Sequence, residues 1–404
     1  MWIGGGIVKT WRMDGKQWRR GLAAFLGAGA FLLAYPAIAP GIDAVLGRAT
    51  LLSAAFSMPG GALETIRQRY AGEVLPESQP EPEAPASSLL PPEVFRPGEV
   101  SPGLLEEPES AASALDQPPE DLLPPPQEGE PPEIPEQYQA VLQTVNMTGE
   151  EENSAFCRYR QGWIRNYTKL EPAEIDQVLE EPAAVLLEKG PEPQVLIYHT
   201  HTTESYEEWD GEVYDSRNNW RSQDNTANMA AVGEELAQGL RAMGIQVLHD
   251  ETQHDYPAYN GAYDRSAATI KDYLEKYPSI KVAIDVHRDA VLYDDGSTIK
   301  VVQEVAGHKA AQLMVIAPCD DGSVGVPGWK ENFRFAAGFT SAVEERYPGL
   351  MRPVFFCYRN YNLWMTPDSL LFEFGTNGNT LEEAKYTARL VAPILGEYLL
   401  GARD

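Results

Sequence analysis

The stretch Val195-Leu-Ile-Tyr-His-Thr-His-Thr-Thr-Glu-Ser-Tyr206 starts as an apolar run and turns polar at His199. This pattern predicts a short strand with chemically capable side chains at its C-terminal end, which is where ligands bind in open α/β sheets. If the backbone stays extended, His199 and His201 project to the same side of the sheet. Two neighbouring imidazoles with Glu204 close behind are suited to holding a metal ion, whereas a lone histidine would more often belong to the core.

The C-terminal half of the chain predicts an α/β fold. Apolar residues at helical spacing follow Asn225 and stop at Gly244, and Thr380 with Glu383 is a capping-box signature for a last helix. Alternation of helices with strands implies a three-layer domain over residues 191–404, with a central, mostly parallel or mixed sheet flanked by helices. Residues 137–190 are expected to form an ordered extension before it. The predicted strands are residues 194–200, 245–249, 280–287, 299–305, 313–317, 354–358 and 370–374.

A second strand ending in polar residues is Val282-Ala-Ile-Asp-Val-His-Arg-Asp289. Period-two alternation places Asp285, His287 and Asp289 on one face and Arg288 on the other. A metal-bound imidazole usually donates its second N–H to a carboxylate or carbonyl, and either aspartate could accept it. The structural alternative is a strand-end salt bridge of Arg288.

A third strand, residues 370–374, is apolar except for Glu373. A buried carboxyl has a raised pKa unless a cation is near, which suits a residue that takes and returns a proton near neutral pH. The turn that follows, with Asn377, offers backbone N–H and amide groups to a polar substrate. The alternative is an ordinary turn before the last helix, with Glu373 in an ion pair.

The third ligand of a zinc site is ambiguous, since a catalytic zinc normally takes three protein ligands. Glu204 lies near the first histidine pair. Asn228 lies on the core-facing side of its helix, and with Asp224 and Asn225 as the expected caps it has no evident structural role. Either residue could complete the site.

The polar and aromatic segment of residues 249–266 is long for a simple connection. It could line a groove for a sugar or a peptide, although a solvated loop is the expected environment of His254. His308 belongs to no motif and is expected to be structural.

The N-terminal part of the chain predicts a membrane anchor and a spacer. Residues 1–20 carry five basic residues and one acidic residue, and residues 21–42 are uncharged and long enough to cross a bilayer. This order predicts a cytoplasmic N-terminus, a single-pass anchor in the cell membrane and an extracytoplasmic remainder; a cleaved signal peptide is the alternative. Residues 43–136 form a linker. Residues 71–135 hold 17 Pro and 15 Asp or Glu against one Arg, which predicts a disordered tether.

Composition excludes several classes of function. The 404 residues include 60 Asp and Glu against 32 Lys and Arg, a net charge of −28, which argues against nucleic-acid binding through phosphates and against adhesion to an anionic membrane by charge alone. Cys157, Cys319 and Cys357 show no spacing of a disulfide framework or a cysteine-rich zinc site. Histidines and carboxylates would have to hold any metal ion.

Together these motifs resemble the stage II sporulation protein P family. The resemblance rests on His-Thr-His-Thr-Thr-Glu-Ser-Tyr at 199–206, Asp-Val-His-Arg-Asp at 285–289 and Phe-Glu-Phe-Gly at 372–375. The helix start at Asn228 and Tyr-Asp-Arg-Ser at 263–266 fit the same pattern. The likeness covers residues 190–404, and the anchor with its tether matches the family's layout.

The resemblance implies an amidase-like fold and a zinc-dependent peptidoglycan hydrolase. Such an enzyme cleaves the amide between N-acetylmuramic acid and L-alanine, and peptide cross-links as well, during septal thinning and engulfment in sporulating cells. The implied partners are a lytic transglycosylase and a membrane scaffold protein.

By position, the resemblance makes His201 and His287 zinc ligands, His199 a supporting or alternative ligand, and Glu373 the catalytic carboxylate. Asn228 stands where the related amidases have a glutamate ligand. Supporting or substrate-binding roles are expected for Glu204, Asp285, Arg288, Asp289, Tyr263, Ser266 and Asn377.

Two other functions stay open. An asparagine in place of a glutamate ligand could mark a non-catalytic envelope scaffold or glycan-binding module. A zinc carboxypeptidase that acts only on stem peptides would differ in the product that it releases.

Overall fold

The computed structural model describes residues 118–127, 129–149 and 152–401. The predicted anchor over residues 21–42 and the first part of the predicted tether lie outside these residues. Among the helices of the described residues, none combines the length and the apolar character that crossing a bilayer requires.

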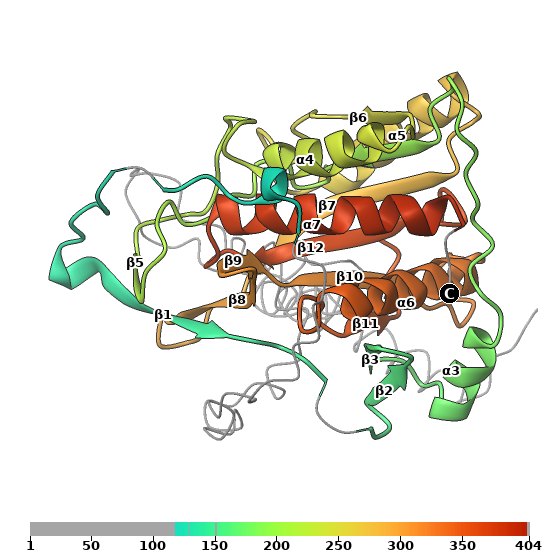
Figure 1. The fold of residues 1–404 in the computed structure, drawn as a ribbon, viewed down its shortest axis with the longest axis horizontal. Helices are drawn as coiled ribbons and strands as arrows, with labels where there is room; N and C mark the ends of the chain where they lie inside the picture. The colour runs from blue at the N-terminus through green and yellow to red at the C-terminus, as the bar shows by residue number, and fades with distance from the viewer. Residues whose placement is uncertain (1–117, 128, 150–151, 402–404) are drawn as a thin grey trace, which may run out of the picture. The chain divides into compact units, whose positions relative to one another are not determined.

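A mixed sheet of eight strands forms the centre of the described structure, in the order β2-β3-β11-β10-β12-β7-β4-β6 (Figure 1). The strands β12, β7, β4 and β6 run parallel, so their C-terminal ends meet at one edge, while β10 is antiparallel to β12. The mixed central sheet expected from the sequence is therefore present. Its strands are β2 (Phe156–Tyr159), β3 (Gly162–Asn166), β4 (Val195–Tyr198), β6 (Val247–His249), β7 (Val282–Asp289), β10 (Leu313–Pro318), β11 (Val354–Cys357) and β12 (Leu370–Thr376).

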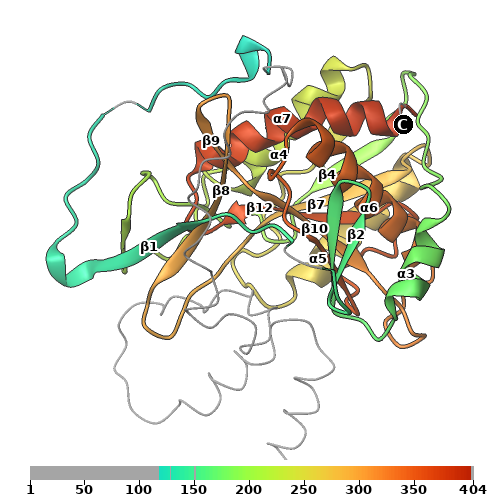
Figure 2. The same ribbon diagram turned by 60° about the horizontal axis from the view of Figure 1, so that its bottom comes forward.

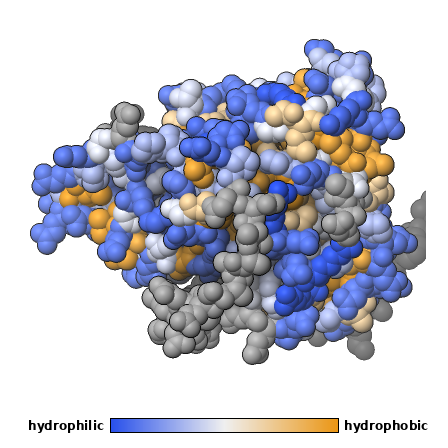
Figure 3. Space-filling view, viewed as in Figure 1, coloured by the Kyte–Doolittle hydropathy of each residue, from blue (hydrophilic) through white to orange (hydrophobic). Residues whose placement is uncertain are grey.

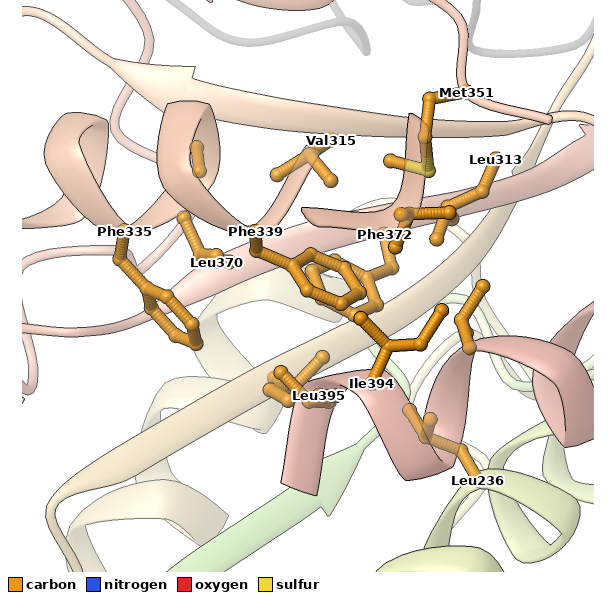
Figure 4. Close-up of a cluster of buried hydrophobic side chains, with 14 of the residues drawn as sticks. Leu236, Leu313, Val315, Phe335, Phe339, Met351, Leu370, Phe372, Ile394 and Leu395 are labelled. Carbon is orange, nitrogen blue, oxygen red and sulfur yellow. The ribbon is translucent and has the colours of Figure 1, made fainter. Parts of the chain in front are cut away.

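Helices cover both faces of this sheet, which gives three layers. The core on one face contains residues of α3 (Pro172–Leu179), α4 (Met229–Ala242), α6 (Trp329–Arg346) and α7 (Leu381–Leu399). In that core Phe339 of α6 stacks on Phe372 of β12 with ring centroids 5.4 Å apart, next to Ile394 of α7 (Figure 4). On the other face α5 (Ala262–Lys276) packs Ile270 against Tyr198 of β4.

A second, four-stranded sheet lies beside the first, in the order β5-β1-β8-β9. It contains β8 (Thr298–Val305), whose sequence also predicts a strand, together with β1 (Gln139–Val145), β5 (Val213–Asp215) and β9 (His308–Ala311). Val141 and Val213 are directly paired and are 52% and 42% exposed. Hydrophobic residues reach the surface at the left of Figure 3, where Figure 1 shows β1 and β5.

The chain before β1 differs from the expected disordered linker that ends at residue 136. A short 3-10 helix, η1 (Glu120–Leu122), lies against α7, where Nε of Arg389 donates a hydrogen bond of 3.0 Å to the Leu122 carbonyl. Leu123 packs on the hydrophobic core, and a second such helix, η2 (Glu136–Tyr138), leads into β1 (Figure 2). The two leucines interrupt the acidic, proline-rich composition and give this segment apolar area to bury.

Candidate metal centre

His201, Glu204 and His287 converge at the edge where the parallel strands end. Nδ1 of His201 lies 3.6 Å from one oxygen of Glu204, and Nδ1 of His287 lies 3.5 Å from the other. One ligand atom from each residue falls within 4.8 Å of the others, and all three side chains are buried. Two imidazoles and one carboxylate form a set of ligands that zinc accepts in catalytic sites.

Local turns explain why Glu204 reaches this position. Strand β4 ends at Tyr198, and the chain then turns so that the Glu204 N–H donates to the His201 carbonyl at 3.1 Å. Because β4 and β7 are adjacent and parallel, the end of β7 brings His287 alongside this turn.

His199 does not join the cluster, because the backbone is not extended beyond Tyr198. Its Nδ1 lies 2.8 Å from the Val286 carbonyl oxygen, and its Nε2 lies 2.9 Å from Nε2 of His249. The expectation that His199 and His201 project to the same side is therefore wrong, and the nitrogens of His199 face other partners.

Arg288 keeps Glu204 charged. Burial alone would raise the pKa of Glu204, but the nearby guanidinium of Arg288 and the two imidazoles hold it well below its ordinary value. Arg288 is itself fixed by hydrogen bonds to the carbonyls of Ser205 and Trp220, at 2.9 and 3.0 Å. An ionised carboxylate is the form that binds a metal ion.

Asp285 lies against His287. An oxygen of Asp285 lies 2.8 Å from Nε2 of His287, which leaves Nδ1 facing Glu204. Asp285 is held by the backbone N–H and hydroxyl of Thr200, and that hydroxyl lies 2.8 Å from Oγ of Ser266. Burial lowers the pKa of His287, but Asp285 and Glu204 outweigh it and raise the pKa well above its usual range.

Aromatic rings enclose His201. Tyr259 stacks on its imidazole with centroids 4.5 Å apart, and Tyr263 meets it edge-on at 5.4 Å. Burial lowers the pKa of His201, which favours the neutral imidazole that a metal requires.

Glu373 lies next to His287, because β12 pairs with β7 in a register that places the two residues opposite each other. Burial raises the pKa of Glu373 to about 8. Its Oε2 is buried and has no hydrogen-bond partner among the residues that the structure describes. A buried acceptor without a partner is costly in a folded protein, which is typical of a functional position.

Asn228 is the N-cap of α4, and this corrects the expected caps Asp224 and Asn225. Its Oδ1 accepts from the Ala230 N–H at 2.9 Å, and its Nδ2 donates to Ser222 and Asn225 at 3.0 and 3.1 Å. The structure brings Glu204 next to the two imidazoles and gives the Asn228 amide a structural role instead.

The remaining expected site residues make contacts within the protein. Asn377 is buried, accepts from the Val291 N–H and donates to Thr298, so its amide faces the protein instead of a substrate. Asp289 forms a buried ion pair of 2.9 Å with Arg352. His254 is also buried, with Nδ1 at 2.7 Å from the His199 carbonyl oxygen, so the expectation of a solvated loop for it is wrong.

Sequence reasoning missed Tyr259, Arg221 and Arg352. Arg221 lies 3.9 Å from Glu204 and pairs with Asp255 at 2.7 Å. The dense aromatic residues of segment 249–266 were the available signal for Tyr259, whereas no local pattern marks the two arginines.

An α/β sheet that gathers two imidazoles, a carboxylate and a buried glutamate at the carboxyl edge of its parallel strands has the arrangement of a candidate metal centre. The family model described as Stage II sporulation protein P matches residues 128–396, more than half of the chain. The chain therefore belongs to the stage II sporulation protein P family. Stage II sporulation protein P of Bacillus subtilis (strain 168) is 28% identical over 230 residues, which are 52% of this chain and 51% of that protein. The chain thus matches about half the length of this relative.

Solved amidase structures are also similar to part of the chain. The N-acetylmuramoyl-L-alanine amidase AmiC2 of Nostoc punctiforme is 13% identical with a TM-score of 0.31, covering 52% of this chain and 99% of that chain. The amidase Ami1 from Mycobacterium smegmatis gives 12% identity and a TM-score of 0.30, covering 52% and 99%. The CwlD amidase from Clostridioides difficile, solved in complex with the GerS lipoprotein, gives 11% and 0.29 with the same coverages of 52% and 99%.

Proposed function

We propose that this chain is a zinc-dependent peptidoglycan hydrolase that cleaves the amide between N-acetylmuramic acid and L-alanine during septal thinning and engulfment in sporulating cells. The observation that supports the proposal most directly is the convergence of His201, Glu204 and His287 beside Glu373, in a chain of the sporulation family. Three protein ligands leave a fourth position for water or substrate, as in catalytic zinc sites.

The residues present fit a zinc ion. Glu204 is held ionised, His201 is favoured in its neutral form, and an oxygen of Asp285 lies 2.8 Å from Nε2 of His287, whose Nδ1 faces Glu204. Zinc held by these three side chains would polarise the scissile carbonyl and lower the pKa of a water molecule.

Glu373 is placed to move the proton. Its pKa is raised to about 8, and its free oxygen can accept a proton from the attacking water and return it to the departing amine. A carboxyl group whose pKa is close to the working pH can accept a proton and release it again at a low cost in free energy.

The substitution Glu373→Gln tests this role. It should leave the zinc content and the fold unchanged and lower the release of stem peptides from purified cell wall by at least about 100-fold, which is the usual contribution of a positioned acid–base group. Glu382→Gln, in the first turn of α7 with a side chain that is 41% exposed, is the control and should retain full activity. Undiminished peptide release by Glu373→Gln would refute the role of Glu373.

Mass spectrometry of the released peptides separates the possible reactions. Amidase action frees the amino group of L-alanine, endopeptidase action opens cross-links, and a carboxypeptidase removes only the last residue of the stem. A non-catalytic scaffold would release nothing. Since Asn228 caps α4, its presence no longer argues for a degenerate metal site.

The cellular setting follows from the same proposal. The uncharged segment of residues 21–42 would anchor the protein once in the cell membrane, with the metal centre on the extracytoplasmic side. A lytic transglycosylase and a membrane scaffold protein are the proposed partners, and copurification from sporulating cells tests them.

A further inference from the structure

A second group of metal-ligating side chains lies at the other side of His199. His249 ends the edge strand β6, Glu234 lies on α4, and Glu251 follows two residues after His249. Nδ1 of His249 is 3.0 Å from Oε2 of Glu234 and 3.8 Å from Oε1 of Glu251. We propose that His249, Glu234 and Glu251 form a second divalent-cation site, separate from His201, Glu204 and His287.

The distances suit one ion. Zinc binds imidazole nitrogen and carboxylate oxygen at about 2.0–2.2 Å, so two ligand atoms in a tetrahedral site lie about 3.3 Å apart. The two separations at His249 Nδ1, 3.0 and 3.8 Å, bracket this value. Small side-chain rotations are then enough to place an ion between the three groups.

The hydrogen-bond partners of His199 fix which nitrogen of His249 is available. His199 is completely buried, with Nδ1 at the Val286 carbonyl oxygen and Nε2 at Nε2 of His249. The Val286 carbonyl can only accept, so Nδ1 of His199 carries the hydrogen and Nε2 holds a lone pair. Nε2 of His249, 2.9 Å away, must therefore be the donor.

This assignment leaves Nδ1 of His249 facing two carboxylates. Nδ1 must carry either a proton or a metal ion, because a bare lone pair would be repelled by the negative charges of Glu234 and Glu251. A divalent cation balances both charges and uses a neutral imidazole. The N–H of His249 at Nε2 then donates to Nε2 of His199. Metal-bound imidazoles usually have such a fixed acceptor for their second N–H.

The surroundings also permit entry of an ion. The side chains of Glu234 and Glu251 are 36% and 53% exposed, whereas that of His249 is 3% exposed. Gln238 and Arg241 donate to Oε1 of Glu234, and Arg241 also reaches Oε2 at 3.3 Å, the oxygen that faces Nδ1 of His249. Mixed nitrogen and oxygen ligands favour zinc or a similar first-row ion over calcium.

Gly233 makes room for the imidazole pair. A Cβ at this position of α4 would lie 2.5 Å from Cε1 of His199 and 2.8 Å from Nε2 of His249. Glycine inside a helix costs about 1 kcal/mol relative to alanine, so the close approach of α4 to the two rings comes at a cost to helix stability.

Zinc stoichiometry of the purified full-length chain in detergent tests the proposal. After zinc loading and dialysis, we expect two ions per wild-type chain by elemental analysis, and one ion in the Glu234→Gln/Glu251→Gln double variant. The double variant should keep its activity on cell wall. A double variant with the same charge change on exposed helix residues, Glu275→Gln/Glu345→Gln, should bind two ions.

The variant His201→Gln separates this test from that of the proposed function. If the second site exists, His201→Gln retains one ion, and adding Glu234→Gln/Glu251→Gln removes it. A zinc content of the Glu234→Gln/Glu251→Gln variant equal to that of the wild type overturns the second site, whatever His201→Gln shows. Loss of zinc in the double variant with none lost in His201→Gln would support the second site and count against the first.

Discussion

Individual side chains of the candidate metal centre depend on buried charges behind them. Arg288 fixes Glu204, Asp285 fixes His287, and Arg352 pairs with Asp289 in the same region. A charge in such a place is tolerated only while its partner is present. Substitutions of these supporting charges should therefore lower the stability of the fold, and affect catalysis mainly through that loss.

Removing Arg352 should strongly destabilise the protein. Arg352→Met leaves the buried carboxylate of Asp289 without its partner, and the free energy of unfolding should fall by about 3–5 kcal/mol in urea titrations. The double variant Arg352→Met/Asp289→Asn removes both charges and should recover part of the loss. A loss under about 1 kcal/mol in the single variant would show that the pair is not buried as described.

Glu207 gives the protein a pH-dependent stability. Burial raises its pKa to about 7, although Trp220 and Asn218 donate hydrogen bonds to it. The folded state thus binds this proton more tightly than the unfolded state, and the stabilisation is lost as pH rises from about 4.5 to about 7. Glu207→Gln should be about 1–3 kcal/mol more stable than wild type at pH 8 and similar at pH 4, by urea titration at both values. Equal pH dependence of the two proteins would contradict this.

Helix packing supplies a test at the level of elements. A Cβ added at Gly239 of α4 would lie 2.4 Å from Cβ of Ala392 on α7. Gly239→Ala should therefore destabilise by about 1–3 kcal/mol despite the better helix propensity of alanine. Adding Ala392→Gly should restore most of the loss, whereas Ala392→Gly alone should cost about 1 kcal/mol. Additive effects of the two changes would argue against this close contact.

Substitutions of Asn228, the N-cap of α4, distinguish a structural role of this residue from a role as a metal ligand. Asn228→Ala should lower the free energy of unfolding by about 1–2 kcal/mol through loss of the cap, with zinc content unchanged. Asn228→Ser keeps a capping oxygen and should lose less. Loss of zinc from a fully folded Asn228→Ala protein would make this residue a ligand after all.

The seven strands expected from the sequence are all present, since apolar runs between turn residues mark buried strands well. Five strands were missed, namely β1, β2, β3, β5 and β9. Four of them are runs of only three to five residues, and β1 is mostly exposed, so none of the five carries a clear hydrophobic pattern. The sequence also predicted that His287 and Glu373 lie at one edge of the sheet, where the structure places them. It left the third ligand open between Glu204 and Asn228 and misjudged the direction of His199, because these placements depend on a turn and a helix start that periodicity does not describe.

At the scale of the whole molecule, the segment before β1 is part of the folded unit. Deleting residues 71–117 should leave thermal unfolding unchanged, since their acidic, proline-rich composition predicts no core. Extending the deletion to residue 135 removes the Leu123 packing and the Leu122 contact with Arg389, and should cost about 1–3 kcal/mol. Identical melting of both deletions would show that this contact adds nothing.

The path of the N-terminal extension decides how the protein carries a mechanical load. The chain first touches α7, then pairs β1 with β8, and then adds β2 and β3 beside β11, before it enters β4. A force applied at the N-terminal side therefore loads these outer attachments one after another. Strand β4, which leads to His201, is loaded last, so a force from the N-terminal side reaches the candidate metal centre only after the outer attachments have given way.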